Sequence, residues 1–89
     1  MTDIDARLAQ IRSRFRQRCR EDLAAIEAGD MPAAELQRVA HRMAGMAGTL
    51  GMNALGEAAR ALDAGIGAGE PSLERKRALI EALRVELAE

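Results

Sequence analysis

The chain has 89 residues, of which 48% are hydrophobic and 30% charged, and its net charge at pH 7 is −1. This composition fits one small folded domain and argues against disorder, and the near-zero charge removes any general attraction to nucleic acid. One cysteine, Cys19, excludes an internal disulfide, and with one histidine it argues against a zinc site built by this chain alone. No apolar run approaches the roughly 20 residues that span a bilayer, and no signal-peptide pattern is present, so we expect a cytoplasmic protein without membrane contact.

The first predicted helix covers residues 3–28. Its apolar residues recur at three- and four-residue steps and form one stripe, which predicts a buried face: Ile4, Leu8, Ile11, Phe15, Cys19, Leu23 and Ile26. Five arginines alternate along residues 12–20 and spread around much of this helix. We expect a solvated surface balanced by nearby acids such as Glu21 and Asp22, the alternative being a basic surface for an acidic partner or nucleic acid.

The second predicted helix covers residues 32–50. Gly29 is expected to cap the first helix and Asp30 to cap the second, with Pro32 in a first turn where its missing N–H costs little. Gly51 is expected to end the helix. Its predicted inward face consists of Leu36, Val39, Ala40, Met43, Ala47 and Leu50.

The third and fourth predicted helices cover residues 53–65 and 72–88, with Asn53 as a cap and the glycine-rich residues 65–71 as a loop. Their predicted core residues are Leu55, Ala58, Ala59, Leu62 and Ile66 in the third, and Leu73, Leu79, Ile80, Leu83 and Leu87 in the fourth. Four amphipathic segments with short connections predict an all-α fold, an antiparallel up-and-down four-helix bundle forming a single domain over residues 1–89.

His41, the only histidine, lies on the outer side of the second predicted helix. At about 100° per residue it is roughly 160° from the centre of the inward face, so we expect it to be exposed. Helical side chains lean toward the N-terminus, so residue i+4 tends to cover residue i. Gly45 is at i+4 from His41 and Gly48 at i+7, and neither can cover the ring. We infer that the two glycines, which weaken the helix by roughly 1–2 kcal/mol together, leave the imidazole open to another molecule.

The residues around His41 limit the chemistry that it can perform. A neutral imidazole is a nucleophile near physiological pH and can carry a covalent intermediate. Arg38 and Arg42 could offset negative charge arriving on the ring, and Gln37 could hydrogen-bond the ring or a group attached to it. Ala44 is placed on the same outward face. Met46 and Met52 are expected to be partly exposed and to offer an adaptable contact surface.

The segment AHRMAGMAGTLGMNALGEAARALD, residues 40–63, resembles the histidine-containing phosphotransfer (HPt) domain. That family has a signature close to A-H-x-L-K-G-x-x-x-x-x-G-x-x-x-L, followed by a hydrophobic–acidic pair. The positions of this chain that match the family are Ala40, His41, Met43 in place of leucine, Gly45, Leu50, Gly51, Leu55 and the pair Leu62-Asp63. Ala44 stands where the family usually has a lysine that helps to hold the phosphoryl group.

The resemblance implies that His41 receives a phosphoryl group from the aspartate of one receiver domain and passes it to another, as a phosphorelay intermediary without turnover of its own. The implied partners are response-regulator receiver domains or a hybrid histidine kinase, and the receiver is expected to bring the Mg²⁺, so that this chain needs no cofactor or metal. We expect a monomer. Two other functions remain open. The chain could be a non-catalytic helical adaptor with a silent His41, as Ala44 suggests, or a DNA-associated protein using its arginine-rich first helix.

Overall fold

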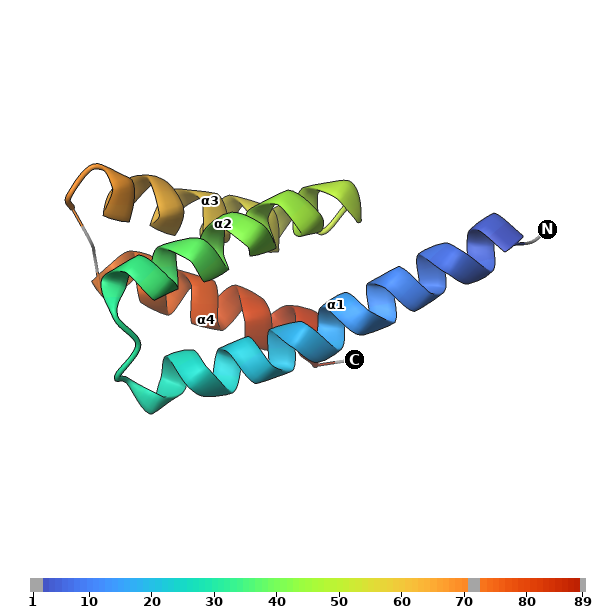
Figure 1. The fold of residues 1–89 in the computed structure, drawn as a ribbon, viewed down its shortest axis with the longest axis horizontal. Helices are drawn as coiled ribbons and strands as arrows, with labels where there is room; N and C mark the ends of the chain where they lie inside the picture. Colours follow the sequence, from blue (N-terminus) through green and yellow to red (C-terminus); the bar gives the residue numbers. More distant parts are fainter. Residues whose placement is uncertain (1–2, 71–72, 89) are drawn as a thin grey trace.

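The computed structural model describes residues 3–70 and 73–88, and this part of the chain forms four α-helices and no strand. The helices are α1 (Asp3–Ala28), α2 (Ala33–Thr49), α3 (Asn53–Gly67) and α4 (Leu73–Leu87). Successive helices run in opposite directions, and α1 packs on α2 and α4 while α3 packs on α2 and α4 (Figure 1). The predicted all-α, antiparallel four-helix bundle is therefore confirmed. No described helix combines the length and the apolar character needed to cross a bilayer.

The core lies between the four helices and is almost entirely aliphatic. Its largest fully buried side chains are Cys19, Ile26, Met43, Leu55, Leu62, Leu79 and Leu83. Alanines that are completely buried, Ala40 and Ala47 on α2 and Ala59 on α3, let these two helices approach closely. The α2–α3 pair makes the most extensive contact in the bundle, and the sole histidine lies along it.

Glycines end the helices where the chain reverses. Gly29 and Gly51 have φ of +88° and +76°, a conformation that favours glycine, so both predicted stops are confirmed. The predicted caps were wrong by one or two positions. Pro32 is the N-cap residue of α2 in place of Asp30, and α3 begins at Asn53 with Met52 preceding it. In neither helix does the N-cap side chain bond to the backbone, so these starts depend on tertiary packing.

The N-terminal part of α1 projects beyond the other helices (Figure 1). Ile4, Leu8 and Ile11 are 73%, 46% and 41% exposed, which contradicts the prediction that the whole apolar stripe is buried. The reason is length, because α1 has 26 residues while α2, α3 and α4 have 15 to 17, so nothing lies opposite its first turns. Burial begins at Phe15.

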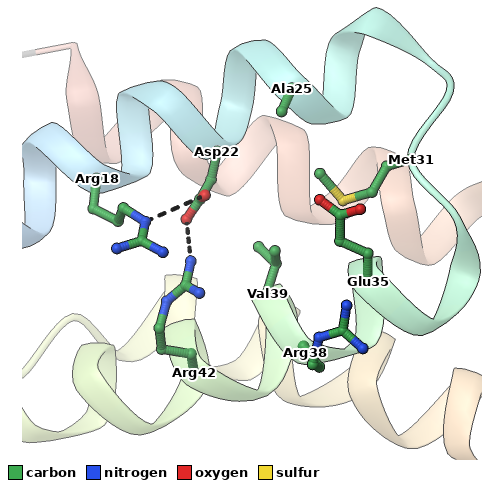
Figure 2. Close-up of a pocket in the computed structure, with 8 residues that line it drawn as sticks. All are labelled: Arg18, Asp22, Ala25, Met31, Glu35, Arg38, Val39 and Arg42. Carbon is green, nitrogen blue, oxygen red and sulfur yellow. Dashed lines mark hydrogen bonds and ion pairs between the residues drawn. The ribbon is translucent and has the colours of Figure 1, made fainter.

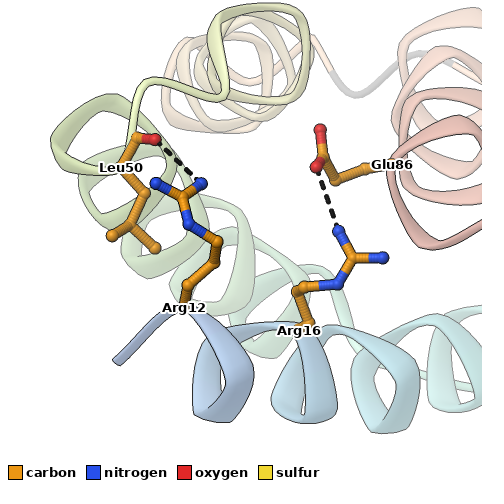
Figure 3. Close-up of polar contacts among 4 residues, drawn as sticks. All are labelled: Arg12, Arg16, Leu50 and Glu86. Carbon is orange, nitrogen blue, oxygen red and sulfur yellow. Dashed lines mark hydrogen bonds and ion pairs between the residues drawn. The ribbon is translucent and has the colours of Figure 1, made fainter. Parts of the chain in front are cut away.

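Two arginines fasten α1 to the bundle near the point where the projecting part begins. Arg12 donates a hydrogen bond of 3.2 Å to the carbonyl of Leu50 at the end of α2, and Arg16 forms an ion pair of 3.2 Å with Glu86 on α4 (Figure 3). The Arg12 contact satisfies a carbonyl that the helix itself leaves unpaired. Part of the arginine-rich segment is therefore structural and is not simply a solvated surface.

The connection between α3 and α4 is shorter than predicted. α3 continues to Gly67, two residues past the predicted end, so part of the predicted loop is helical. Gly65 is buried because the Arg75 side chain lies against it, in space that a Cβ at position 65 would occupy. Leu73, expected in the core, is 61% exposed at the start of α4. The predicted first residue of this helix, Ser72, lies outside the described residues.

Candidate functional site

His41 lies near the middle of α2 at the edge that faces α3, and its side chain is 80% exposed. The outward orientation predicted from the helical pattern is therefore what the structure shows. The helix beneath it is packed into the bundle, because Ala40 and Met43 are buried in the core. The arrangement presents an imidazole to solvent from a packed helix.

Asp63 on α3 holds the ring. Nδ1 of His41 lies 2.8 Å from Oδ2 of Asp63, and Nε2 of Gln37 donates a hydrogen bond of 3.2 Å to the other carboxylate oxygen. The hydrogen bond from His41 outweighs partial desolvation and lowers the pKa of the Asp63 carboxyl below its ordinary value. A carboxylate can only accept, so Nδ1 is the donor in this contact, and in the neutral tautomer with its proton on Nδ1 the other nitrogen, Nε2, keeps its lone pair.

Asp63 was not among the predicted site residues. Sequence reasoning placed Gln37 beside the ring or an attached group, whereas Gln37 bonds to the carboxylate that orients the ring. The available signal was the acidic residue of the pair Leu62-Asp63. Leu62 is buried, so the next residue along α3 points toward the edge of the bundle. Sequence spacing does not show that this edge faces His41.

The surface beside His41 is bare. Gly45 and Gly48 are both exposed, and a Cβ placed on either would meet no side chain within 4 Å. These are the two glycines that we expected to leave the imidazole uncovered, and the structure places both on the open surface of α2. A second molecule can therefore reach the ring along the C-terminal half of this helix.

Ala44 does not lie on the open surface. It is only 8% exposed, so the prediction that it faces outward beside His41 was wrong. At about 100° per residue, Ala44 lies roughly 60° from His41 on the side of Asp63. That rotation turns the side chain into the contact between α2 and α3, where a small residue fits.

Arg42 is turned away from the α2–α3 edge. It forms an ion pair of 2.7 Å with Asp22, a carboxylate on α1 that is only 9% exposed, and Arg18 lies 3.8 Å from the same carboxylate (Figure 2). This contact gives Arg42 a structural partner that the sequence did not reveal. Arg38 is exposed and lines a pocket of about 280 Å³ between α1 and α2, on the same side as Arg42.

The two methionines that were predicted to be partly exposed, Met46 and Met52, differ in burial. Met46 is 37% exposed, as expected, and it lines a groove of about 320 Å³ together with Ile11, Phe15 and three arginines, Arg14, Arg18 and Arg42. Met52 is 5% exposed and belongs to the core, so its predicted exposure was wrong. It lies directly after the glycine turn and donates its backbone N–H to the carbonyl of Ala47, which draws its side chain inward.

The described part of the chain contains no group of three or more histidine, cysteine or acidic side chains able to hold a metal ion. The site therefore consists of one exposed imidazole, a carboxylate and amide that orient it, and a strip without side chains beside it. The model of the Hpt domain family matches residues 10–89. The chain belongs to the Hpt domain family. Curated proteins and solved structures gave no significant match.

As an Hpt domain, the protein belongs to a family of histidine phosphotransfer domains that serve phosphorelays and interact with receiver domains and kinases. Such domains carry phosphoryl groups and are generally not enzymes in the ordinary sense. The match includes His41 and both helices that form the site, and it leaves out most of the projecting turns of α1. The family resemblance noted from residues 40–63 is confirmed.

Proposed function

We propose that His41 is the phosphoacceptor of this Hpt domain and relays a phosphoryl group between receiver-domain aspartates in a two-component phosphorelay. The observation that carries the proposal is the pairing of an 80% exposed ring with a carboxylate on Nδ1. That pairing directs the unprotonated Nε2 toward solvent, where a docking protein can reach it. An imidazole kept only for solubility needs no such partner.

The proposed transfer step conserves atoms and charge without a base on this chain. The lone pair of Nε2 attacks the phosphorus of an aspartyl phosphate, the Nε2–P bond forms, and the P–O bond electrons leave with the aspartate carboxylate. The ring becomes positively charged while Nδ1 keeps its proton. Asp63 stabilises that charge, and Gln37 holds Asp63 in place. The reverse step returns the phosphoryl group to a second receiver.

The rest of the site fits a reaction that two proteins complete together. Phosphoryl transfer depends mainly on positioning and on stabilising charge. In the proposal, the receiver or hybrid kinase supplies Mg²⁺ and the acidic pocket. This chain acts as a monomer and supplies an uncovered imidazole with no cofactor of its own. Gly45 and Gly48 admit the partner, and Met46 at the nearby groove supplies adaptable apolar contact.

The test is a phosphotransfer profile against the phosphorylated receiver domains of the source organism. The expected product is a base-stable, acid-labile phosphate on the wild-type chain and none on a folded His41→Gln variant. Labelling of His41→Gln at the wild-type level would refute the proposal. If no receiver or kinase labels the wild-type chain, the adaptor function with a silent His41 becomes the better explanation.

A further inference from the structure

The contact between α2 and α3 follows a regular register. His41 pairs with Asp63, the amide nitrogen of Gln37 lies 3.1 Å from where a Cβ on Gly67 would be, and the backbone nitrogen of Gly48 lies 3.7 Å from the same point on Gly56. In each of these pairs the two residue numbers sum to 104, whereas the contact of Ala47 with Gly56 gives 103 and the side-chain bond of Gln37 to Asp63 gives 100, so the register is fixed to within one turn. In antiparallel helices this constant sum identifies the residues that lie at the same level.

The same register places Arg60 of α3 opposite Ala44. Arg60 is therefore three residues from the level of His41, about 4.5 Å along the helix axis. By the 100° step it also lies about 60° from Asp63 around α3, next to Gly56. Since Gly56 is buried against α2 and Arg60 is exposed, Arg60 forms the outer rim of this contact, on the face that carries His41.

The guanidinium of Arg60 lies against the α2–α3 contact at the level of Gly48 and Gly56, so the side chain has to turn along the helix axis to reach the level of His41. Its Nη2 is 3.7 Å from where a Cβ on Gly56 would be, and Ala47 and Gly48 of α2 lie within the same distance of that point. Gly48 has no side chain, and a Cβ placed on it would meet nothing within 4 Å, so α2 presents open surface at this level. Among the described residues, no carboxylate pairs with Arg60 in a salt bridge or hydrogen bond, so its charge is not already neutralised.

The other cations near His41 are directed elsewhere. Arg42 is bound to Asp22, and Arg38 lines the pocket between α1 and α2 (Figure 2). Arg38 is one turn before His41 and about 60° from it around α2, on the side away from Gln37 and Asp63. The one anionic side chain bonded to the ring, Asp63, contacts Nδ1 and would repel a dianion on Nε2. A phosphoryl group on Nε2 therefore gains most from a cation on the α3 side.

We propose that Arg60 is the phosphoryl-binding cation of this domain and reaches across the α2–α3 contact to the group carried by His41. Ala44, opposite Arg60, is small and only 8% exposed, so at this level α2 carries no more than a methyl group toward α3. Arg60 offsets the charge of the phosphoryl group in the phosphorylated state. In the unphosphorylated state the ring carries no such charge and does not need Arg60. This inference depends on the proposed function, because it requires a phosphoryl group on His41.

The experiment loads the protein with phosphoramidate, which gives phosphohistidine and ammonia without a receiver, and follows the ³¹P resonance through a pH titration. Arg60 favours the dianion, so Arg60→Gln should raise the phosphoryl pKa by about 0.3–0.7 unit, the size expected for an exposed charge pair. Arg60→Lys should restore most of the shift. Arg38→Gln removes the same charge on the other side of His41 and should change the pKa by less than half as much.

The same samples give a second measurement, the hydrolysis half-life of phosphohistidine, which should shorten by about 2- to 5-fold in Arg60→Gln and recover in Arg60→Lys. Equal titration curves for wild type and Arg60→Gln, or equal effects of Arg60→Gln and Arg38→Gln, would overturn the assignment of Arg60 while leaving His41 as the phosphoacceptor. A wild-type protein that yields no phosphohistidine resonance would overturn both proposals.

Discussion

His41 and Asp63 are joined across two helices by a contact of 2.8 Å between Nδ1 and Oδ2. The contact links α2 to α3 at the point where the imidazole leaves the bundle, and it determines which ring nitrogen faces solvent. Exposure alone would leave the ring free to rotate and to exchange tautomers. The carboxylate removes that freedom, so the site is ordered before any partner arrives.

Replacing Asp63 should weaken the phosphoacceptor without unfolding the protein. Asp63→Asn removes the negative charge that holds the Nδ1 proton and stabilises the ring once it becomes positive. We expect phosphotransfer to His41 to slow by about 10-fold, the lower end for a charge-assisted hydrogen bond because the ring is exposed. Rapid-quench transfer rates measure this. Glu57→Gln, which neutralises an exposed carboxylate on the same helix that pairs with no other described residue, should stay within about 2-fold of wild type.

The depressed pKa of Asp63 also gives a stability prediction. A carboxyl whose pKa is lower in the folded state stabilises the fold above its unfolded pKa, near 4, and loses that contribution as the pH falls through the folded value. The difference in unfolding free energy between wild type and Asp63→Asn should therefore shrink as the pH falls below about 4. Urea unfolding at a series of pH values tests the sign, and a difference that grows between pH 4 and pH 2 would contradict it.

Gly45 offers a test of the open surface. Gly45→Ala should raise the free energy of unfolding by about 0.5–1 kcal/mol, since alanine is the better helix former and the added methyl meets no side chain within 4 Å. Gly45→Leu should keep the fold but slow phosphotransfer, because the longer side chain leans over His41.

The matched control for Gly45→Leu is Ala61→Leu, which adds a leucine to an exposed position on α3 two residues before Asp63. Successive helical residues turn by about 100°, so this position faces away from the α2–α3 edge. Denaturation curves and transfer rates of the three variants separate helix propensity from access to the ring. A Gly45→Leu protein that transfers at the wild-type rate would show that the glycine does not serve access.

The fold could be predicted from the sequence because helix periodicity and glycine stops are local signals. The same local signals misplaced Ile4, Leu8 and Ile11, since a repeating stripe does not show how far the neighbouring helices extend. The orientation of His41 was predicted for the same local reason. Asp63 was missed, and Ala44 and Met52 were misplaced, because the register between helices and the packing of a turn depend on contacts distant in the chain.

The half-buried ion pair of Asp22 and Arg42 should matter for stability and little for phosphotransfer. Arg42→Met keeps the apolar stem but leaves a nearly buried carboxylate with only the 3.8 Å contact to Arg18. We expect a loss of about 1–2 kcal/mol, less than for a fully buried pair because Arg42 is 42% exposed. Transfer rates should stay within about 2-fold of wild type.

Arg14→Met is the control for Arg42→Met, because it removes an exposed arginine of the same helix pair that has no ion-pair partner in the described residues. Its effect on unfolding should be close to zero. The double variant Asp22→Asn with Arg42→Met should lose less than the sum of the single changes, since it leaves no unpaired charge. A sum that is fully additive would show that the pair does not couple α1 to α2.

The thiol of Cys19 should be inert while the protein is folded. Burial, reinforced by the nearby Asp22 carboxylate, raises the pKa of this thiol to about 12, and the side chain is 1% exposed. The thiolate is the reactive form, so at pH 8 alkylation by iodoacetamide should be about a thousandfold slower in the native protein than in urea. Because reaction then requires opening of the bundle, Arg42→Met should alkylate faster than wild type, in proportion to its lost stability. Native alkylation within tenfold of the unfolded rate would mean that α1 separates from the core far more readily than its packing predicts.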